Sequence, residues 1–408
     1  MKVPAIVTVA KRFDLIVGKF TVKMTTIYTR LLQKPENSIF LFGPRGTGKS
    51  TWIRGLFGDA VVYDFLDSRE AIRLERNPGA LFSEVESLPP GSWVVFDEVQ
   101  KIPAVLNEVH RLIETRRLRF VLCGSSARKL KRGDANLLAG RAIVTELFPL
   151  TSAELGRDFD VSTALVNGAL PLALEGSDPQ GYLATYTATY LNEEIRMEAL
   201  TRNVGAFSRF LEIAARQNGQ VTNISNIARD AAVARTTVQN YFDILIDTLI
   251  GYLVPAWKLK RSTKQISHPK FYVFDTGVAR ALSGRLPYPP SQEELGPLLE
   301  NLIFNEIRAY LSYQELHYQP SFWSSYDGTE VHFFCETRDG FVGVEIKTSV
   351  NWQKKFGRGL LRLKREMAPA KVKSYGVYRG NRAARIEDID IFPVRLFLQM
   401  LWDGEIIR

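Results

Sequence analysis

The sequence predicts an α/β protein that begins with a parallel sheet covered by helices on both faces. Between residues 38 and 150, short apolar runs alternate with segments of helical periodicity, an order typical of strands joined by crossover helices. The runs are continuously apolar, as in Trp-Val-Val-Phe at residues 93–96, which suits strands that are buried on both faces. Two polar motifs directly follow such runs, so both are expected at the edge where the parallel strands end.

We expect five strands in this first domain, at residues 39–42, 60–65, 93–96, 120–123 and 142–146. Its helices are expected at residues 50–57, 80–87, 105–115 and 135–138. The first strand is preceded by an N-terminal segment, residues 1–37, in which we expect a lead-in helix over residues 25–33.

The first polar motif is a glycine-rich turn with the composition of a phosphate-binding loop. It contains, in order, Gly43, Pro44, Arg45, Gly46, Thr47, Gly48, Lys49, Ser50 and Thr51. Glycines let backbone N–H groups curve around phosphate oxygens without Cβ clashes. A lysine at the end of such a loop reaches the β- and γ-phosphates, and the next hydroxyl ligates Mg²⁺. The segment therefore predicts an ATP site, with Lys49 at the phosphates and Ser50 at the metal.

The second polar motif is the acidic pair Asp97 and Glu98, which ends the third expected strand as a Walker B pair. Asp97 is expected to hold the Mg²⁺ shell, and Glu98 is expected to polarise the water that attacks the γ-phosphate. The alternative is a glycine turn beside an unrelated acidic strand end. Because both motifs sit in the strand context that they require, we expect ATP hydrolysis.

Two further residues of this domain are candidates for the same chemistry. Ser125 follows the fourth expected strand, where its hydroxyl would orient the attacking water; the alternative is a serine turn that caps the next helix. Arg141 precedes the fifth strand and would act as an arginine finger in a neighbouring subunit, which implies a homo-oligomer. A surface or structural role is the alternative for Arg141.

We expect residues 38–150 to form the ATPase core. After it, we expect a helical lid at residues 151–205 and a winged-helix module at residues 206–256. Tyr182, Tyr186 and Tyr190 recur at a spacing of four in the lid, which indicates packing. In the module, Arg235 and Gln239 begin the third helix, where a DNA-reading helix contacts bases. The rest of that helix is mostly apolar, so a purely structural helical module is the alternative.

The sequence of residues 257–408 predicts a second α/β domain, and positive charge is concentrated in one stretch of it. Residues 352–385 hold eleven lysines and arginines against one acid, Glu366, whereas the whole chain has a net charge of +9. Such a stretch is the electrostatic footprint of a protein that binds DNA or another polyanion. A solvated basic helix and hairpin is the alternative.

Several motifs together resemble the prokaryotic AAA+-type "ATP-binding proteins" that carry a C-terminal domain of unknown function. The resembling motifs are residues 43–50, 96–103, 123–130, 138–141, 190–195, 237–245, 274–277 and 344–349. The resemblance implies a restriction-endonuclease-like fold for the last domain, with a possible nuclease-like site. The candidate residues of that site are Glu300, Glu330, His332, Glu345 and Lys347.

Glu345 and Lys347 are two apart on an expected strand, so they share one face, where a carboxylate can bind Mg²⁺ and a lysine can stabilise phosphate charge. The family's Glu-Val-Asp is Glu330-Val331-His332 in this chain. Imidazole is a poor ligand for a hard cation, so this departure puts nuclease activity in doubt.

The composition limits the remaining classes. The 408 residues are 45% hydrophobic and 24% charged, as in soluble proteins of several domains. No apolar run approaches the roughly 18 residues of a membrane span, and the chain has only two cysteines. We therefore expect a cytoplasmic protein without a membrane partner. Two alternatives to a DNA-coupled ATPase are kept: an ATP-regulated metal-dependent nuclease, and a nucleotide-gated scaffold that recruits a protein.

Overall fold

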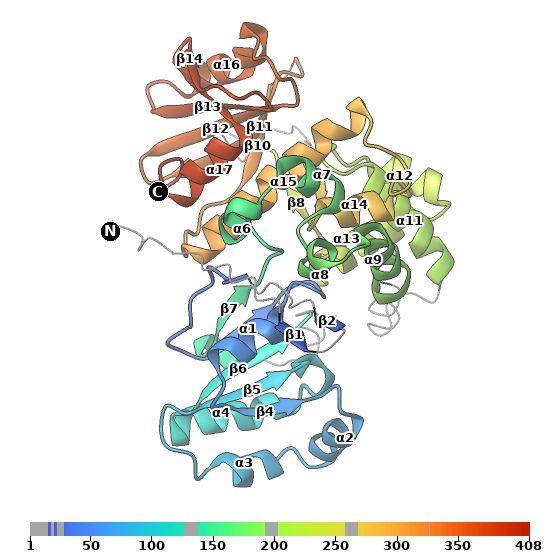
Figure 1. The fold of residues 1–408 in the computed structure, drawn as a ribbon, viewed down its shortest axis with the longest axis vertical. Helices are drawn as coiled ribbons and strands as arrows, with labels where there is room; N and C mark the ends of the chain where they lie inside the picture. Colours follow the sequence, from blue (N-terminus) through green and yellow to red (C-terminus); the bar gives the residue numbers. More distant parts are fainter. Residues whose placement is uncertain are drawn as a thin grey trace.

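The computed structural model describes residues 15–17, 20–22, 28–125, 138–191, 203–257, 268–325 and 327–408. Figure 1 shows the sheet of the first domain at one end, a C-terminal sheet at the other, and a group of helices beside them. Within the described ranges, no helix has both the length and the apolar character needed to cross a membrane. Near the N-terminus, β1 (Leu15–Val17) pairs antiparallel with β2 (Phe20–Val22).

The first sheet has five strands, all parallel, in the order β4-β5-β6-β3-β7. The strands are β3 (Ile39–Phe42), β4 (Val61–Asp64), β5 (Trp93–Asp97), β6 (Arg119–Gly124) and β7 (Ile143–Glu146). All five expected strands are thus present. Because β6 lies between β3 and β5, the ends of the strands that carry the two polar motifs are separated by one strand.

Helices cover both faces of this sheet, as the continuously apolar strands predicted. Phe40 and Phe42 pack on one face, against the helices α2 (Ser68–Arg76), α3 (Ala80–Val85) and α4 (Val105–Arg116). Ile39 and Leu41 point to the other face, against α1 (Lys49–Leu56). Two 3₁₀ turns, η1 (Val99–Lys101) and η2 (Leu138–Gly140), complete the domain.

One expected helix of this region is not found over its described residues, and another lies mostly outside the described ranges. Residues 28–33 have no helical structure, because the N–H of Leu31 donates to the Glu154 carboxylate at 2.8 Å instead of to a helical carbonyl. Residues 25–27 lie outside the described ranges, as do residues 135–137 of the helix expected at 135–138, and Leu138 begins the turn η2. Helix α2 was not predicted; Asp67 caps it by accepting from the Arg69 N–H.

A helical region links the two sheets (Figure 1). It begins with α6 (Ser152–Leu155), η3 (Gly156–Asp158), α7 (Val161–Asn167), α8 (Pro171–Glu175), α9 (Pro179–Thr185) and the π-helical turn η4 (Tyr186–Leu191). It continues with α11 (Val204–Arg216), α12 (Ile224–Ala231), α13 (Arg235–Asp247), the antiparallel strands β8 (Gly251–Val254) and β9 (Lys270–Val273), and α14 (Thr276–Leu282).

One hydrophobic core extends from Leu170 to Leu286 across this region. Tyr186 is buried in it beside Phe274, and Tyr182 packs against it, so these two tyrosines pack as expected. The side chain of Tyr190 is outside the described ranges. The described residues of the expected lid and of the expected winged-helix module therefore share one core.

The C-terminal sheet has six strands in the order β10-β11-β12-β13-β15-β14. The strands are β10 (Ser321–Ser324), β11 (Glu330–Thr337), β12 (Gly340–Lys347), β13 (Val372–Tyr378), β14 (Ala384–Ile386) and β15 (Ile389–Pro393). Helices α15 (Gln292–Tyr313) and α17 (Val394–Trp402) pack on one face. The turn η5 (Lys354–Gly357) leads into α16 (Arg358–Met367), which packs on the other face.

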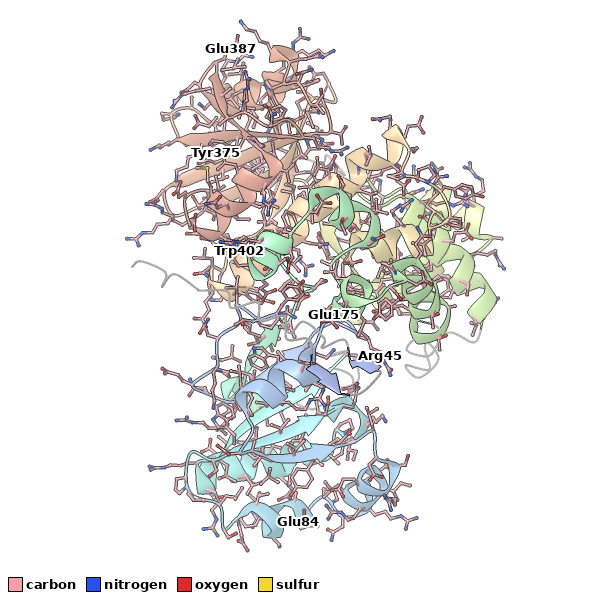
Figure 2. The ribbon with its side chains drawn as sticks, in the orientation of Figure 1. Arg45, Glu84, Glu175, Tyr375, Glu387 and Trp402 are labelled. Atoms are coloured by element: carbon pink, nitrogen blue, oxygen red, sulfur yellow. The ribbon has the colours of Figure 1, made fainter. Side chains whose placement is uncertain are left out.

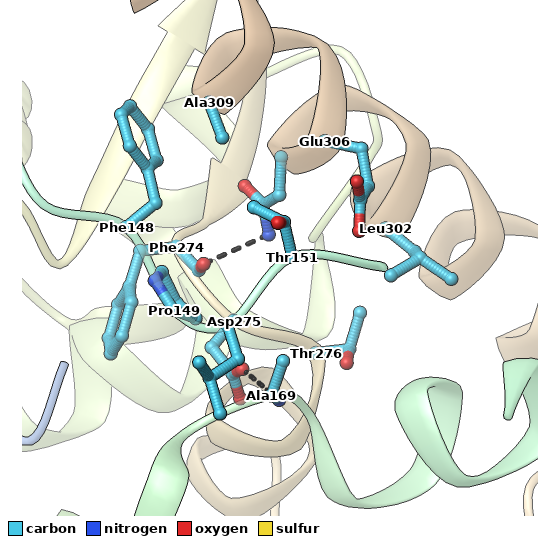
Figure 3. Close-up of a pocket in the computed structure, with 12 residues that line it drawn as sticks. Phe148, Pro149, Thr151, Ala169, Phe274, Asp275, Thr276, Leu302, Glu306 and Ala309 are labelled. Carbon is cyan, nitrogen blue, oxygen red and sulfur yellow. Dashed lines mark hydrogen bonds between the residues drawn. The ribbon is translucent and has the colours of Figure 1, made fainter. Parts of the chain in front are cut away.

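Helix α15 joins the C-terminal sheet to the rest of the chain through its buried polar residues. The Glu306 carboxylate accepts from the Ser152 N–H at 2.6 Å, the Ser152 hydroxyl at 2.8 Å and the Trp402 indole at 2.7 Å. Figure 3 shows Glu306 in a pocket bordered by Thr151 and by Asp275, which accepts from the Ala169 N–H. Burial raises the pKa of Glu306 to about 7.

The raised pKa of Glu306 predicts a pH-dependent stability. Between pH 5 and pH 7 the folded chain keeps a proton that the unfolded chain has released, so stability falls as the pH rises through this window. The shift from the ordinary value of 4.5 to about 7 corresponds to about 3 kcal/mol at full effect. We expect Glu306→Gln to flatten the fall in melting temperature between pH 5 and pH 8. Glu36→Gln, at an exposed glutamate, is the control, and an equal fall in both variants would contradict this role.

Candidate nucleotide site

The glycine-rich turn lies between β3 and α1, and its backbone needs glycine. Gly46 and Gly48 have φ values of +83° and +92°, a left-handed region that side chains with a Cβ rarely adopt. A Cβ on Gly43 would lie 2.5 Å from the Leu147 carbonyl oxygen. The loop is therefore a cradle whose backbone can approach a phosphate closely.

The structure brings the two polar motifs into contact. The Ser50 hydroxyl, in the first turn of α1, donates to the Asp97 carboxylate at the end of β5, at 3.0 Å. The Lys49 ammonium donates to the carbonyl oxygens of Gly43 and Pro44 at 2.6 and 3.1 Å, so it lies within the loop. A hydroxyl and a carboxylate are the oxygen ligands that Mg²⁺ prefers, so these residues fit the metal that the sequence implied.

Glu98 and Ser125 also lie together, joined by a residue that was not predicted. The Gln100 side-chain N–H donates to the Glu98 carboxylate, and the same nitrogen lies 3.3 Å from the Ser125 hydroxyl oxygen. Ser125 follows the end of β6, the strand between the two motif-bearing strands. The Glu98 carboxylate, the Gln100 amide and the Ser125 hydroxyl thus lie together at the edge of the sheet that carries the loop.

Arg141 lies at the edge of the sheet where the parallel strands begin, opposite the edge where they end and the nucleotide motifs lie. It lies two residues before the start of β7 and pairs with Glu114, in the last turn of α4. The nucleotide motifs follow the ends of parallel strands, whereas Arg141 precedes the beginning of one. The side chain therefore does not serve the site of its own subunit, and a role in a neighbouring subunit stays a prediction.

Arg30 is a further residue of this site that sequence analysis missed. Its guanidinium donates to the Thr47 carbonyl at 2.6 Å, the Phe148 carbonyl at 2.5 Å and the Tyr313 hydroxyl at 3.2 Å, and it pairs with Glu154 at 3.0 Å. The Arg30 side chain is 8% exposed and that of Glu154 is fully buried. A lone arginine in an irregular segment carries no sequence signal for such a role.

The helical region also borders the loop. The Tyr186 hydroxyl donates to the Arg45 carbonyl at 2.9 Å, and a Cβ on Gly46 would lie 3.0 Å from the Tyr182 hydroxyl. Figure 2 shows Arg45 at the level where the sheet of the first domain meets the helices. The tyrosines that the sequence assigned to packing therefore touch the phosphate-binding loop as well.

The C-terminal candidates also converge, but cations from the chain occupy their carboxylates. His332 lies 3.1 Å from both Glu300 and Glu345, and Lys347 pairs with Glu345 at 2.6 Å. Lys270 from β9, which was not predicted, pairs with Glu300 at 3.3 Å and contacts Glu330. Three carboxylates thus face two lysines and one histidine.

The protonation of His332 sets the charge of this cluster. Burial lowers its pKa, but the Glu300 and Glu345 carboxylates outweigh burial and raise the pKa to about 10. The Ile346 N–H also approaches the imidazole Nδ1, at 3.1 Å, a contact that would need a lone pair there. The two adjacent carboxylates favour a proton on the imidazole, whereas the Ile346 N–H opposes one on Nδ1, and Glu345 Oε2 has no hydrogen-bond partner among the described residues. In the described parts of the chain, no group of three or more histidine, cysteine, aspartate or glutamate residues is arranged to hold a metal.

Models of three domain families match successive parts of the chain. An AAA domain matches residues 35–156, a domain of unknown function (DUF8612) matches residues 158–288, and a second domain of unknown function (DUF4143) matches residues 295–397. The chain therefore carries an AAA-type P-loop ATPase domain and a C-terminal domain of unknown function. Both were implied by the resemblance in its motifs, which is thus confirmed.

The relatives that the chain matches are themselves uncharacterized. One, from Mycobacterium tuberculosis, is 27% identical over 319 residues, which cover 76% of this chain and 70% of the relative. Another, from Methanocaldococcus jannaschii, is 24% identical over 311 residues, with 67% of each chain covered. Among solved structures, the ADP form of the ORC2 protein of Aeropyrum pernix is 13% identical, with 66% of this chain and 88% of that chain covered. Its TM-score of 0.26 is too low to carry an argument.

Proposed function

We propose that this protein is a Mg²⁺-dependent ATPase that couples its nucleotide state to the binding of DNA, or a similar polyanion, by its C-terminal domain. The contact between Ser50 and Asp97 carries the first half of this proposal. It places the two expected metal-binding side chains at one point beside a loop that fits phosphates. Mg²⁺ held there would neutralise charge on the β- and γ-phosphates.

The chain's own residues supply the remaining chemistry. Backbone N–H groups of the loop and the Lys49 ammonium bind the phosphates. Glu98 accepts a proton from the attacking water, and Ser125 donates a hydrogen bond that orients it. Tyr182 and Tyr186 limit the space beside the loop.

Arg30 supports the coupling half of the proposal. Its bond to the Thr47 carbonyl fixes the planar peptide between Thr47 and Gly48. The N–H of a trans peptide points away from its carbonyl, so the Gly48 N–H is directed away from Arg30. The same guanidinium donates to Tyr313 in the last turn of α15. A movement of the loop on nucleotide binding would therefore displace Arg30, and through it α15, the helix that supports the C-terminal sheet.

Unpaired positive charge supports a polyanion as the partner. Three cations of the basic stretch form ion pairs. Arg362 pairs with Asp327 and Glu366, and Lys364 pairs with Asp388. Arg385 pairs with Asp388 and Asp390. The other eight cations of residues 352–385 form no ion pair within the described parts of the chain: Lys354, Lys355, Arg358, Arg365, Lys371, Lys373, Arg379 and Arg382. Helices α11–α13 with β8 and β9 have the element order of a winged helix, which would add a second contact with DNA.

Two other functions are less well supported. A nuclease needs carboxylates that are open to a metal, whereas those of the C-terminal cluster face Lys270, Lys347 and His332. A scaffold that recruits only a protein would leave the unpaired cations without a use, and its DNA affinity would be absent or insensitive to salt.

The ATPase half of the proposal predicts distinct effects of two substitutions. Lys49→Ala removes the ammonium at the phosphates, so we expect loss of ATP binding. Glu98→Gln keeps the shape of the site but cannot accept the proton, so we expect ATP to bind while turnover falls at least about a hundredfold. Steady-state phosphate release and the binding of a fluorescent ATP analogue measure both effects. Turnover unchanged in both variants would refute the mechanism.

The polyanion half predicts a steep salt dependence of DNA binding. The slope of log association constant against log salt should become shallower by about 2–3 when Lys354, Lys355 and Arg358 are changed to alanine, because each phosphate contact contributes about 0.9. Lys34, Arg69 and Arg76, which are exposed on or near the ATPase domain, provide the matched triple control. Fluorescence anisotropy with a labelled 20-base-pair duplex gives the slope. The duplex should stay intact with Mg²⁺, and equal slopes for the two triple variants would contradict the assignment.

A further inference from the structure

Gln100 occupies a special place in the ATPase site. It lies in the 3₁₀ turn η1, directly after the Walker B pair, and is 7% exposed. Its side-chain nitrogen contacts both the Glu98 carboxylate and the Ser125 hydroxyl. Gln100 therefore connects both expected water-handling groups by hydrogen bonds.

The orientation of the Gln100 amide follows from its partners. A carboxylate accepts hydrogen bonds, so the amide must turn its nitrogen, and not its oxygen, toward Glu98. The oxygen then lies against the backbone of Gly124, where a Cβ would be 2.4 Å away. This oxygen has no hydrogen-bond partner among the described residues. The donation to Glu98 is thus kept although it leaves a buried acceptor unpaired, which has a cost in stability.

The backbone around Gln100 is held as firmly as its side chain. Glu98 has φ +58° and ψ +44°, a left-handed conformation that is unfavourable for a residue with a side chain and usually marks a functional constraint. The Lys101 N–H donates to the Glu98 carbonyl at 3.0 Å, and the Lys101 ammonium donates to the Phe65 carbonyl at 3.0 Å. The turn is therefore anchored to the end of β4, which leaves Gln100 little freedom to move.

We propose that Gln100 is a positioning residue for hydrolysis. Its amide holds one oxygen of the Glu98 carboxylate and the Ser125 hydroxyl in a fixed relation, which leaves the other carboxylate oxygen free to take the proton of the attacking water. This inference rests on the proposed ATPase function. It differs from a role in filling the core, because it depends on the hydrogen-bond donor and not on the volume of the side chain.

Two substitutions separate the donor from the volume. Gln100→Met keeps a similar size without a donor, and Gln100→Glu keeps the shape but places a second carboxylate against Glu98. We expect the turnover number to fall at least about tenfold for Gln100→Met and further for Gln100→Glu, since like charges repel. The dissociation constant for the ATP analogue should stay within about threefold of the wild-type value, because the hydrogen bonds of the Gln100 side chain to described residues go to Glu98 and Ser125 and not to the loop or Ser50.

A double-mutant cycle shows whether Gln100 acts through Glu98. In the Glu98→Gln background, adding Gln100→Met should cause no further loss, since the group that it positions is already inactive. Gln314→Met, at an exposed glutamine at the end of α15, is the control and should keep wild-type turnover. The melting temperatures of all variants are measured alongside, so that a folding defect is visible.

The outcomes are distinguishable. A wild-type protein that does not hydrolyse ATP overturns both the proposed function and this inference. If the wild type hydrolyses ATP, turnover of Gln100→Met within twofold of wild type, or full activity of Gln100→Glu, overturns the positioning role alone. Independent, additive losses in the double variant would also overturn it.

Discussion

The hydrogen bond between Ser50 and Asp97 joins the two halves of the nucleotide site, and it exists because β3 and β5 end at the same edge of one parallel sheet. The intervening strand β6 gives this edge a third contributor, Ser125, and the turn after β5 supplies Glu98 and Gln100. The strand order therefore determines which side chains can share a phosphate, a metal ion and a water molecule. Each part of the proposed chemistry depends on that arrangement.

A second constraint links this edge to the remainder of the chain. Arg30 and Glu154 form a buried ion pair, and removal of one partner from such a pair costs about 3–5 kcal/mol because the other charge is left uncompensated. Glu154 also caps α6, where it accepts from the Thr151 N–H at 2.9 Å, and Arg30 extends the contact to Tyr313. The phosphate-binding loop, the first helix of the linking region and α15 are thus held by one charged group, and the proposed coupling to the C-terminal domain rests on this contact.

The parts of the site that sequence could predict are those carried by local patterns. The loop, Asp97 and Glu98 follow continuous apolar strands, and Glu345 and Lys347 share a face because strand side chains alternate. Arg30, Gln100 and Lys270 could not be predicted, since each acts through contacts with segments far away in sequence or from a turn without periodicity. The expected helix over residues 25–33 failed for a related reason: a tertiary contact with Glu154 takes the backbone donor of Leu31, and such contacts override local propensity.

The most direct test of the account is the Mg²⁺ dependence of ATP affinity in the wild type and in Asp97→Asn. If Ser50 and Asp97 hold the metal that the triphosphate needs, Mg²⁺ should tighten the binding of a fluorescent ATP analogue at least about tenfold in the wild type. Asp97→Asn should lose most of that gain and keep the metal-free affinity. An equal gain from Mg²⁺ in both proteins would contradict the central claim, because the metal would then bind without the strand end that the fold places beside the loop.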